Sequence, residues 1–301
     1  MTTGHITATP GVELGFEIFE GQGPTVLLIM GLGAQMLLWP DPFCQELAAR
    51  GHRVIRFDNR DVGLSTRLDH LPPPPLWRLL GAAVTRRPAG APYTLQDLAD
   101  DAAGLMQGLQ VRRAHVVGAS MGGMIAQLLA IHHPARVASL VSIMSAPSIH
   151  LAGYPSPRAA RALLSRPADP SEEAAVAQMV RTFTTIGSQT YPPDPEELGQ
   201  LARACFARGV SGAGFLRQLA AILDAPDRRE ALAQVKIPAT VIHGRQDPLV
   251  QLRGGEQTAA ALPNAELLIL DDMGHDLPRP LWPEILDAIQ RTIARGVADG
   301  L

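Results

Sequence analysis

The stretch Gly118-Ala119-Ser120-Met121-Gly122 decides the fold of this 301-residue chain. It follows the apolar run 114–117 and precedes the helix-like run 124–130, so a strand, a tight turn and a helix are expected in that order. In that context the G-x-S-x-G pattern is typical of a strained turn whose serine hydroxyl projects from the backbone. Gly118 and Gly122 would let the strand and the helix pass without a Cβ clash. The pattern predicts Ser120 as a nucleophile, the alternative being an ordinary strand–helix turn.

Short apolar runs alternate with helical patterns on both sides of this turn. Strands are expected at 12–19, 25–30, 53–57, 114–117 and 137–144, and helices at 39–50, 94–109 and 121–133. Thr94 and Asp97 have the spacing of a helix-capping box. The alternation predicts an α/β fold with a mostly parallel central sheet flanked by helices.

Two segments depart from this alternation. Residues 69–92 are rich in proline and are interpreted as a surface excursion. After Pro147 no strand pattern appears before residue 237, and three aspartates each precede a glutamate by three residues, as at helix starts. These pairs are Asp169 with Glu172, Asp194 with Glu197, and Asp227 with Glu230. The pattern predicts a helical cap over 148–228, inserted into a core of 1–147 and 229–301.

The expected cap helices have apolar faces that need to be buried against another surface. One face carries Met179 and Phe183, and another carries Phe215. A cap placed over the carboxyl end of the sheet would bring these side chains above Ser120 as a mostly apolar substrate pocket. The alternative is that the faces only pack on each other.

The strand–loop alternation resumes after the predicted cap and supplies an acid and a base. A strand at 239–243 runs into Asp247, and a strand at 265–270 runs into Gly274-His275. The carboxyl ends of parallel strands share one edge of a sheet, where functional groups collect. Ser120, Asp247 and His275 are therefore predicted to form a catalytic triad. The alternatives are a turn aspartate before proline and a surface-loop histidine.

A triad of this kind needs two N–H groups to bind the oxyanion. Met121, the residue after the nucleophile, is expected to supply one of them. Leu32, flanked by Gly31 and Gly33 after the strand at 25–30, is expected to supply the other. The alternative for the second position is a plain glycine turn.

Composition excludes several classes of function. The chain is 46% hydrophobic and 18% charged with a net charge of −3, and no dense basic run favours nucleic acid or an anionic membrane. Cys44 and Cys205 are too few for a disulfide framework, and no His/Cys/Asp cluster has metal-ligand spacing. We expect no metal and no cofactor. Neither a signal peptide nor a membrane span is evident, so a cytoplasmic protein is expected. The oligomeric state is not indicated.

These motifs together resemble the α/β-hydrolase superfamily over nearly the whole chain. They are the glycine loop at 31–33, Arg60-Asp61 with Gly63 and Ser65, the turn at Ser120, Asp247-Pro248 and Gly274-His275. The chain further resembles bacterial small-molecule esterases such as aclacinomycin methylesterase, through Trp39-Pro40-Asp41, Ala114-His115-Val116-Val117 and Met273-Gly274-His275. In one departure, Met30 stands where many members have a histidine.

The resemblance implies ester hydrolysis under a helical cap. With the predicted triad it indicates a serine carboxylesterase that cleaves small, mostly apolar carboxylic esters through an acyl-enzyme. The same triad also serves C–C bond hydrolases, acyltransferases and perhydrolases, and the fold also occurs in non-catalytic ligand-binding proteins. The expected partner is a small-molecule ester substrate.

Overall fold

A single eight-stranded sheet runs through the molecule, with strand order β1-β2-β4-β3-β5-β6-β7-β8. The computed structural model describes residues 1–85, 87–150 and 152–298. The hairpin β1–β2 and the pair β2–β4 are antiparallel, while all other neighbours are parallel. The strands are β1 (Thr2–Thr9), β2 (Val12–Phe19), β3 (Thr25–Ile29), β4 (Arg53–Phe57), β5 (Ala114–Ala119), β6 (Val137–Ile143), β7 (Ala239–Gly244) and β8 (Ala265–Leu270). The predicted mostly parallel α/β fold is confirmed.

The two faces of the sheet bury separate apolar cores, because successive strand residues point to opposite faces. Along β3, Leu27 and Ile29 belong to one core, and Val26 and Leu28 belong to the other. The first core is covered by α3 (Leu95–Gly108), α4 (Met121–His132), α9 (Arg229–Leu232) and α10 (Leu252–Ala261). The second is covered by α1 (Asp41–Ala49) and α11 (Trp282–Ala298). Three short 3₁₀ helices lie at Met36–Leu38, Pro134–Arg136 and Arg279–Leu281.

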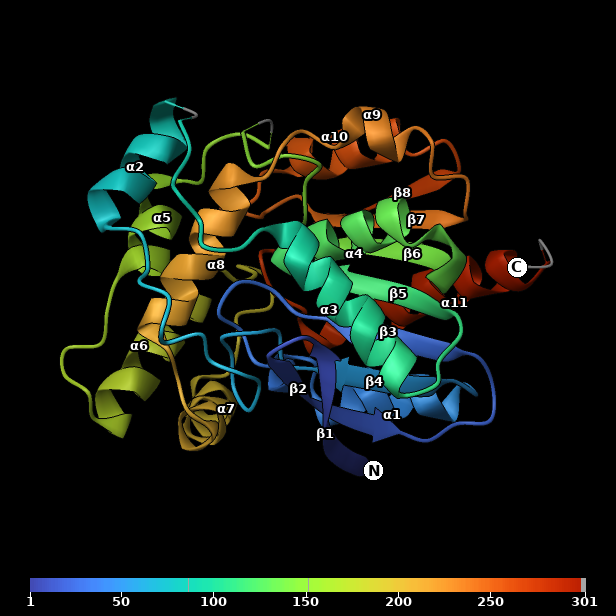
Figure 1. The fold of residues 1–301 in the computed structure, drawn as a ribbon, viewed down its shortest axis with the longest axis horizontal. Helices are drawn as coiled ribbons and strands as arrows, with labels where there is room; N and C mark the ends of the chain where they lie inside the picture. The colour runs from blue at the N-terminus through green and yellow to red at the C-terminus, as the bar shows by residue number, and fades with distance from the viewer. Residues whose placement is uncertain (86, 151, 299–301) are drawn as a thin grey trace.

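Four further helices separate β6 from β7 and stand to one side of the sheet and its flanking helices (Figure 1). They are α5 (Pro157–Leu164), α6 (Glu172–Ile186), α7 (Pro195–Arg208) and α8 (Gly212–Asp224), which we call the helical layer. All four lie within the segment 148–228 that the sequence predicts to be a cap.

The proline-rich segment 69–92 is more ordered than the sequence predicts. It contains helix α2 (Leu76–Thr85), which lies beside the helical layer (Figure 1). Leu79 and Ala82 of α2 are buried and pack with Ala220 of α8. Most residues of 69–92 are exposed or partly exposed, as expected of a surface excursion, but the sequence does not predict this helix, which buries apolar side chains against α8.

Two of the three predicted helix starts differ in the structure. Helix α7 begins as expected, with the Asp194 carboxylate accepting hydrogen bonds from the amides of Glu196 and Glu197. Helix α6 is instead capped by Ser171, whose hydroxyl accepts from Ala174 N, while Asp169 accepts from Ser171 N. Helix α9 follows Arg228, and Asp227 accepts from Arg229 N without acting as the N-cap. In both cases the aspartate predicted to cap the helix lies one or two residues before the observed N-cap.

The strand β1 and the helix α5 are absent from the sequence prediction. Strand β1 pairs with β2 at the edge of the sheet, and most of its residues are partly or fully exposed. None of the helices in the described part of the chain is long and apolar enough to span a bilayer.

Candidate active site

Ser120, His275 and Asp247 meet beyond the carboxyl ends of β5, β8 and β7. The Ser120 hydroxyl lies 3.0 Å from His275 Nε2, and His275 Nδ1 lies 2.7 Å from Asp247 Oδ2. Because Nδ1 faces a carboxylate, it carries the proton, and Nε2 is then free to accept the hydrogen bond of the serine. The other Asp247 oxygen accepts from the amides of Leu249 and Val250 at 2.8 and 2.9 Å. The structure thus brings together all three residues of the predicted triad.

A second histidine, His243, lies close to the triad but is not part of its hydrogen-bonded series. His243 Nε2 is 3.7 Å from Asp247 Oδ2 and donates a hydrogen bond to the carbonyl of Val250 at 2.8 Å. Burial is the largest influence on the pKa of His243 and lowers it below the ordinary histidine value. His243 therefore stays neutral, and it does not compete with His275 for the charge of Asp247.

The turn at Ser120 has the strained geometry that the sequence predicts. Ser120 has φ +56° and ψ −120°, and it immediately precedes the first turn of α4. A Cβ at Gly118 would lie 2.1 Å from the carbonyl oxygen of Gly122, and one at Gly122 would lie 2.1 Å from that of Ile29. Only glycine fits at both positions, so this close approach of strand and helix fixes the direction of the serine side chain.

The two expected oxyanion donors flank Ser120. Met121 is the first residue of α4, and Leu32 follows Gly31, whose missing Cβ would lie 3.1 Å from Ser120 Cβ. In the hydrogen-bond network of the described residues, neither the Leu32 amide nor the Met121 amide donates to a protein acceptor. Both amides are therefore available for a developing oxyanion.

A cavity of about 2030 Å³ lies between the triad and the helical layer. Ser120, Leu32, Met121 and His275 line one side of it. Met179, Phe183 and Phe215, the three residues predicted to form a pocket, line the cavity from α6 and α8. Most of the other lining side chains are apolar as well. The cavity is larger than the roughly 300–1,000 Å³ of ordinary ligand pockets.

Residues 24–278 match the family model of the α/β hydrolase fold. The chain belongs to the α/β-hydrolase family. Rhodomycin D methylesterase DnrP of Streptomyces peucetius is 30% identical over 285 residues, with 88% of this chain and 89% of the relative covered. A 2-hydroxymuconate semialdehyde hydrolase of Pseudomonas sp. strain CF600 is 31% identical, with 85% and 82% covered. The crystal structure of an enol-lactonase from Burkholderia xenovorans LB400 aligns with a TM-score of 0.70 at 26% identity, with 98% and 100% covered.

In this α/β hydrolase, polar side chains from distant segments hydrogen-bond to the glycine loop around residues 31–33. They do so although Met30 stands where many members have a histidine. The Asn59 amide donates to the Met30 carbonyl at 3.0 Å, and Met36 N donates to the Asp58 carboxylate at 2.7 Å. Between them, Gly33 N donates to Gln218 Oε1 at 2.8 Å, and Gln218 Nε2 donates to the Arg60 carbonyl at 2.8 Å. Gln218 is fully buried and comes from α8, so the helical layer holds part of the predicted oxyanion loop.

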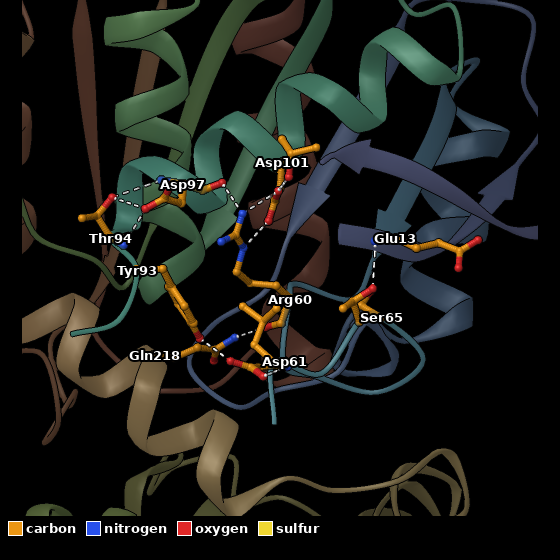
Figure 2. Close-up of polar contacts among 12 residues, drawn as sticks. Glu13, Arg60, Asp61, Ser65, Tyr93, Thr94, Asp97, Asp101 and Gln218 are labelled. Carbon is orange, nitrogen blue, oxygen red and sulfur yellow. Dashed lines mark hydrogen bonds and ion pairs between the residues drawn. The ribbon is translucent and has the colours of Figure 1, made fainter. Parts of the chain in front are cut away.

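The Arg60-Asp61 motif of the hydrolase forms two buried ion pairs, part of which Figure 2 shows. Arg60 donates to both oxygens of Asp101 on α3, at 2.6 and 2.8 Å. Asp61 accepts from Arg217 of α8 at 2.6 and 2.8 Å and from the Tyr93 hydroxyl at 2.7 Å. The loop after β4 is thereby fixed to α3 on one side and to the helical layer on the other.

Loss of Arg217 should destabilise the hydrolase strongly. Burial alone would raise the pKa of Asp61, but the hydrogen bonds of Arg217, the Leu68 amide and Tyr93 outweigh it, so the net pKa is lowered. Arg217→Met would leave this buried carboxylate without its cation, and we expect a loss of about 3–5 kcal/mol in the free energy of unfolding measured in urea at pH 7. Because the folded pKa of Asp61 is lowered, the contribution is present at neutral pH. It should shrink as the pH falls below about 3.9.

The matched variant for this measurement is Arg217→Met combined with Asp61→Asn. It removes both charges, so it should be more stable than Arg217→Met alone. Equal stability of the two variants at pH 7 would contradict the assignment of the loss to an uncompensated Asp61 carboxylate.

Several residues that support the site have no signal in the sequence. Gln218, Arg217 and Asn59 look like ordinary polar surface positions, because nothing near them in the chain shows which loop they contact. Within residues 1–85, 87–150 and 152–298, no group of three or more His, Cys, Asp or Glu side chains is arranged to hold a metal ion.

Proposed function

We infer the reaction from the family and from the site together. The family match and the methylesterase relatives indicate an ester-cleaving hydrolase. Beyond that, we propose that the chain is a serine carboxylesterase that works through an acyl-enzyme. The observation that carries this proposal is the hydrogen-bonded chain from Asp247 through His275 to Ser120, which opens into the apolar cavity.

The proposed reaction uses the same groups of the site in acylation and in deacylation. Ser120 Oγ attacks the ester carbonyl carbon while His275 Nε2 takes the hydroxyl proton, and Asp247 stabilises the imidazolium. The Leu32 and Met121 amides hold the oxyanion of the tetrahedral intermediate. His275 then gives its proton to the departing alcohol, which leaves an acyl group on Ser120. His275 then takes a proton from water as the water attacks this acyl group, and it returns the proton to Ser120 Oγ as the acid is released.

We propose that the helical layer is a cap and that the substrate is an ester with a large apolar portion. The cavity volume of about 2030 Å³ and its apolar walls support this, whereas the sequence alone predicts a small ester. The named relative DnrP is a methylesterase, so a methyl ester of a bulky acid is our first choice of substrate class. The methyl group on the alcohol side of such an ester is small, so the acid portion would occupy most of the cavity.

A fluorophosphonate probe tests the mechanism directly. We expect it to label Ser120 in the wild-type protein, as located by peptide mass spectrometry, with a burst of p-nitrophenol from p-nitrophenyl esters. Labelling of another residue would overturn the role of Ser120, and absence of labelling would favour a non-catalytic ligand-binding protein.

The similarity to a 2-hydroxymuconate semialdehyde hydrolase makes C–C bond hydrolysis the second candidate. A comparison of p-nitrophenyl esters with a vinylogous diketone separates the two reactions. Faster turnover of the diketone would favour the second candidate over the esterase.

Selectivity should depend on the walls contributed by α6. Each buried methylene of an acyl chain should add at most about 0.8 kcal/mol, or roughly fourfold in kcat/KM, until the cavity is full. In Met179→Ala or Phe183→Ala we expect this chain-length profile to shift toward longer chains, because the cavity is larger. The measurement is kcat/KM over a series of p-nitrophenyl esters.

Val176→Ala is the matched control, since Val176 is on the same helix and lies beside Gly199 of α7. It should leave the profile unchanged. An unchanged profile in Met179→Ala and Phe183→Ala as well would mean that α6 supports the structure without selecting the substrate.

A further inference from the structure

The segment that follows α6 is hydrogen-bonded to the loop that carries His275. The His275 amide donates to the Ile186 carbonyl at 2.8 Å, and the Gly274 amide donates to Ser188 Oγ at 2.8 Å. Ser188 in turn donates to Asp276 Oδ1 twice, from its amide at 3.0 Å and from its hydroxyl at 2.5 Å. Three consecutive residues, 274–276, are therefore held by the last residue of α6, Ile186, and by Ser188 just after it.

The packing between these two segments leaves no space for a side chain at Gly187 or Gly274. A Cβ at Gly274 would lie 2.4 Å from the carbonyl carbon of Gly187, and one at Gly187 would lie 2.9 Å from Asp276 Oδ2. Ser188 is 1% exposed, so its hydroxyl finds its partners in the protein rather than in water. Burial is also the largest influence on the pKa of Asp276 and raises it, while the Ser188 hydrogen bonds act in the opposite direction.

We propose that Ser188 and Asp276 are positioning residues that fix the backbone of 274–276 and so hold the His275 imidazole between Asp247 and Ser120. This inference rests on the proposed function, in which His275 is the general base. A misplacement of about 1 Å in a catalytic group can cost roughly 10²-fold in rate. The pair connects the base to α6, and the Met179 and Phe183 side chains of α6 line the cavity. The helical layer thus belongs to the catalytic apparatus as well as to the pocket.

The first test is Ser188→Ala, with Asp272→Ala as its control. Asp272 accepts a hydrogen bond from Thr190 Oγ1 at 2.8 Å, so its side chain joins the same loop to the segment after α6 through a different hydrogen bond. In Ser188→Ala we expect kcat for a p-nitrophenyl ester to fall about tenfold to a hundredfold, with KM within about twofold of wild type. The rate constant for fluorophosphonate labelling should fall in parallel, because labelling also needs the base. Asp272→Ala should leave both quantities near wild type.

The second test separates position from charge at Asp276. Asp276→Asn keeps an oxygen that can accept both Ser188 hydrogen bonds, so it should retain most of kcat. Asp276→Ala removes the acceptor and should lose as much as Ser188→Ala. An equal loss in Asp276→Asn and Asp276→Ala would overturn the positioning role, since the carboxylate charge would then be the property that matters. This pair also decides the matter if Ser188→Ala does not fold.

Failure of this inference is distinguishable from failure of the proposed function. Absence of fluorophosphonate labelling in the wild type would reject the serine mechanism. Wild-type labelling with an equal rate in Ser188→Ala would reject the positioning role alone. If Ser188→Ala and Asp272→Ala lower the melting temperature alike and leave kcat unchanged, the contact is only structural.

Discussion

Replacing Ser120 by alanine should abolish ester hydrolysis while the protein stays folded. The Oγ that we propose attacks the carbonyl is lost, and only binding and the proposed oxyanion donors remain, which leave a residual of about 10³–10⁴ above the reaction in water. Alanine accepts the positive φ at this position about as poorly as serine does, so the strain at the turn is retained. The measurement is kcat/KM for a p-nitrophenyl ester, with the melting temperature recorded for both proteins.

Ser139→Ala is the matched control for this variant. It removes a buried hydroxyl on the neighbouring strand β6, where Ser139 Oγ lies 2.8 Å from His115 Nδ1. It should keep its activity. Activity close to wild type in purified Ser120→Ala would end the covalent mechanism.

Replacing Asp247 by asparagine should have the second largest effect. The amide keeps the size of the side chain but no longer holds the Nδ1–H tautomer of His275, and it removes the charge that stabilises the imidazolium. The precedent in a serine protease is a loss of about 10⁴ in kcat. We expect a loss that approaches this value, since the neighbouring His243 is kept neutral by burial and supplies no negative charge in place of Asp247.

Asp271→Asn serves as the control for the acid. Asp271 is in the loop before His275, but its side chain is 75% exposed and pairs with Arg245. This variant should remain within about twofold of wild type, because an exposed ion pair contributes little. A loss below about tenfold in Asp247→Asn would place the acid elsewhere.

The central strands and the meeting of Ser120, Asp247 and His275 could be predicted because their signals are local. Strand β3 is an almost continuous apolar run, and β6 is apolar except for two serines, since both faces of the sheet are covered there. Ser120, Asp247 and His275 each lie just beyond the carboxyl end of a parallel strand, so the topology of the sheet is enough to bring them together.

The elements that were missed lie where local signals conflict. In β1 most residues are partly or fully exposed, so it has no apolar run. Four prolines precede α2, and α2 is apolar on two sides: Leu79 and Ala82 are buried, while Trp77 and Val84 remain exposed. At the start of α6, both Asp169 and Ser171 are residue types that cap helices. The sequence does not show which of them is the N-cap, and the backbone places Ser171 there.

The supporting residues could not be predicted, because their roles depend on contacts that are distant in sequence. Gln218 meets Gly33 across 185 positions, and Ser188 meets Gly274 across 86. No periodicity or motif records such a pairing. A glutamine within a helix, or a serine just after one, has the same local appearance whether it faces solvent or the loops of the site.

The separation of β6 from β7 has a consequence for synthesis on the ribosome. Strand β6 is buried along its whole length, and one of its edges pairs only with β7, which follows the intervening residues 144–238. At roughly 5–20 residues per second, about 5–20 s pass between the emergence of the two strands. During that time the nascent sheet presents an unpaired apolar edge, which is a template for aggregation. Chaperone dependence of the newly made chain should therefore be greatest while the segment between these strands is being translated.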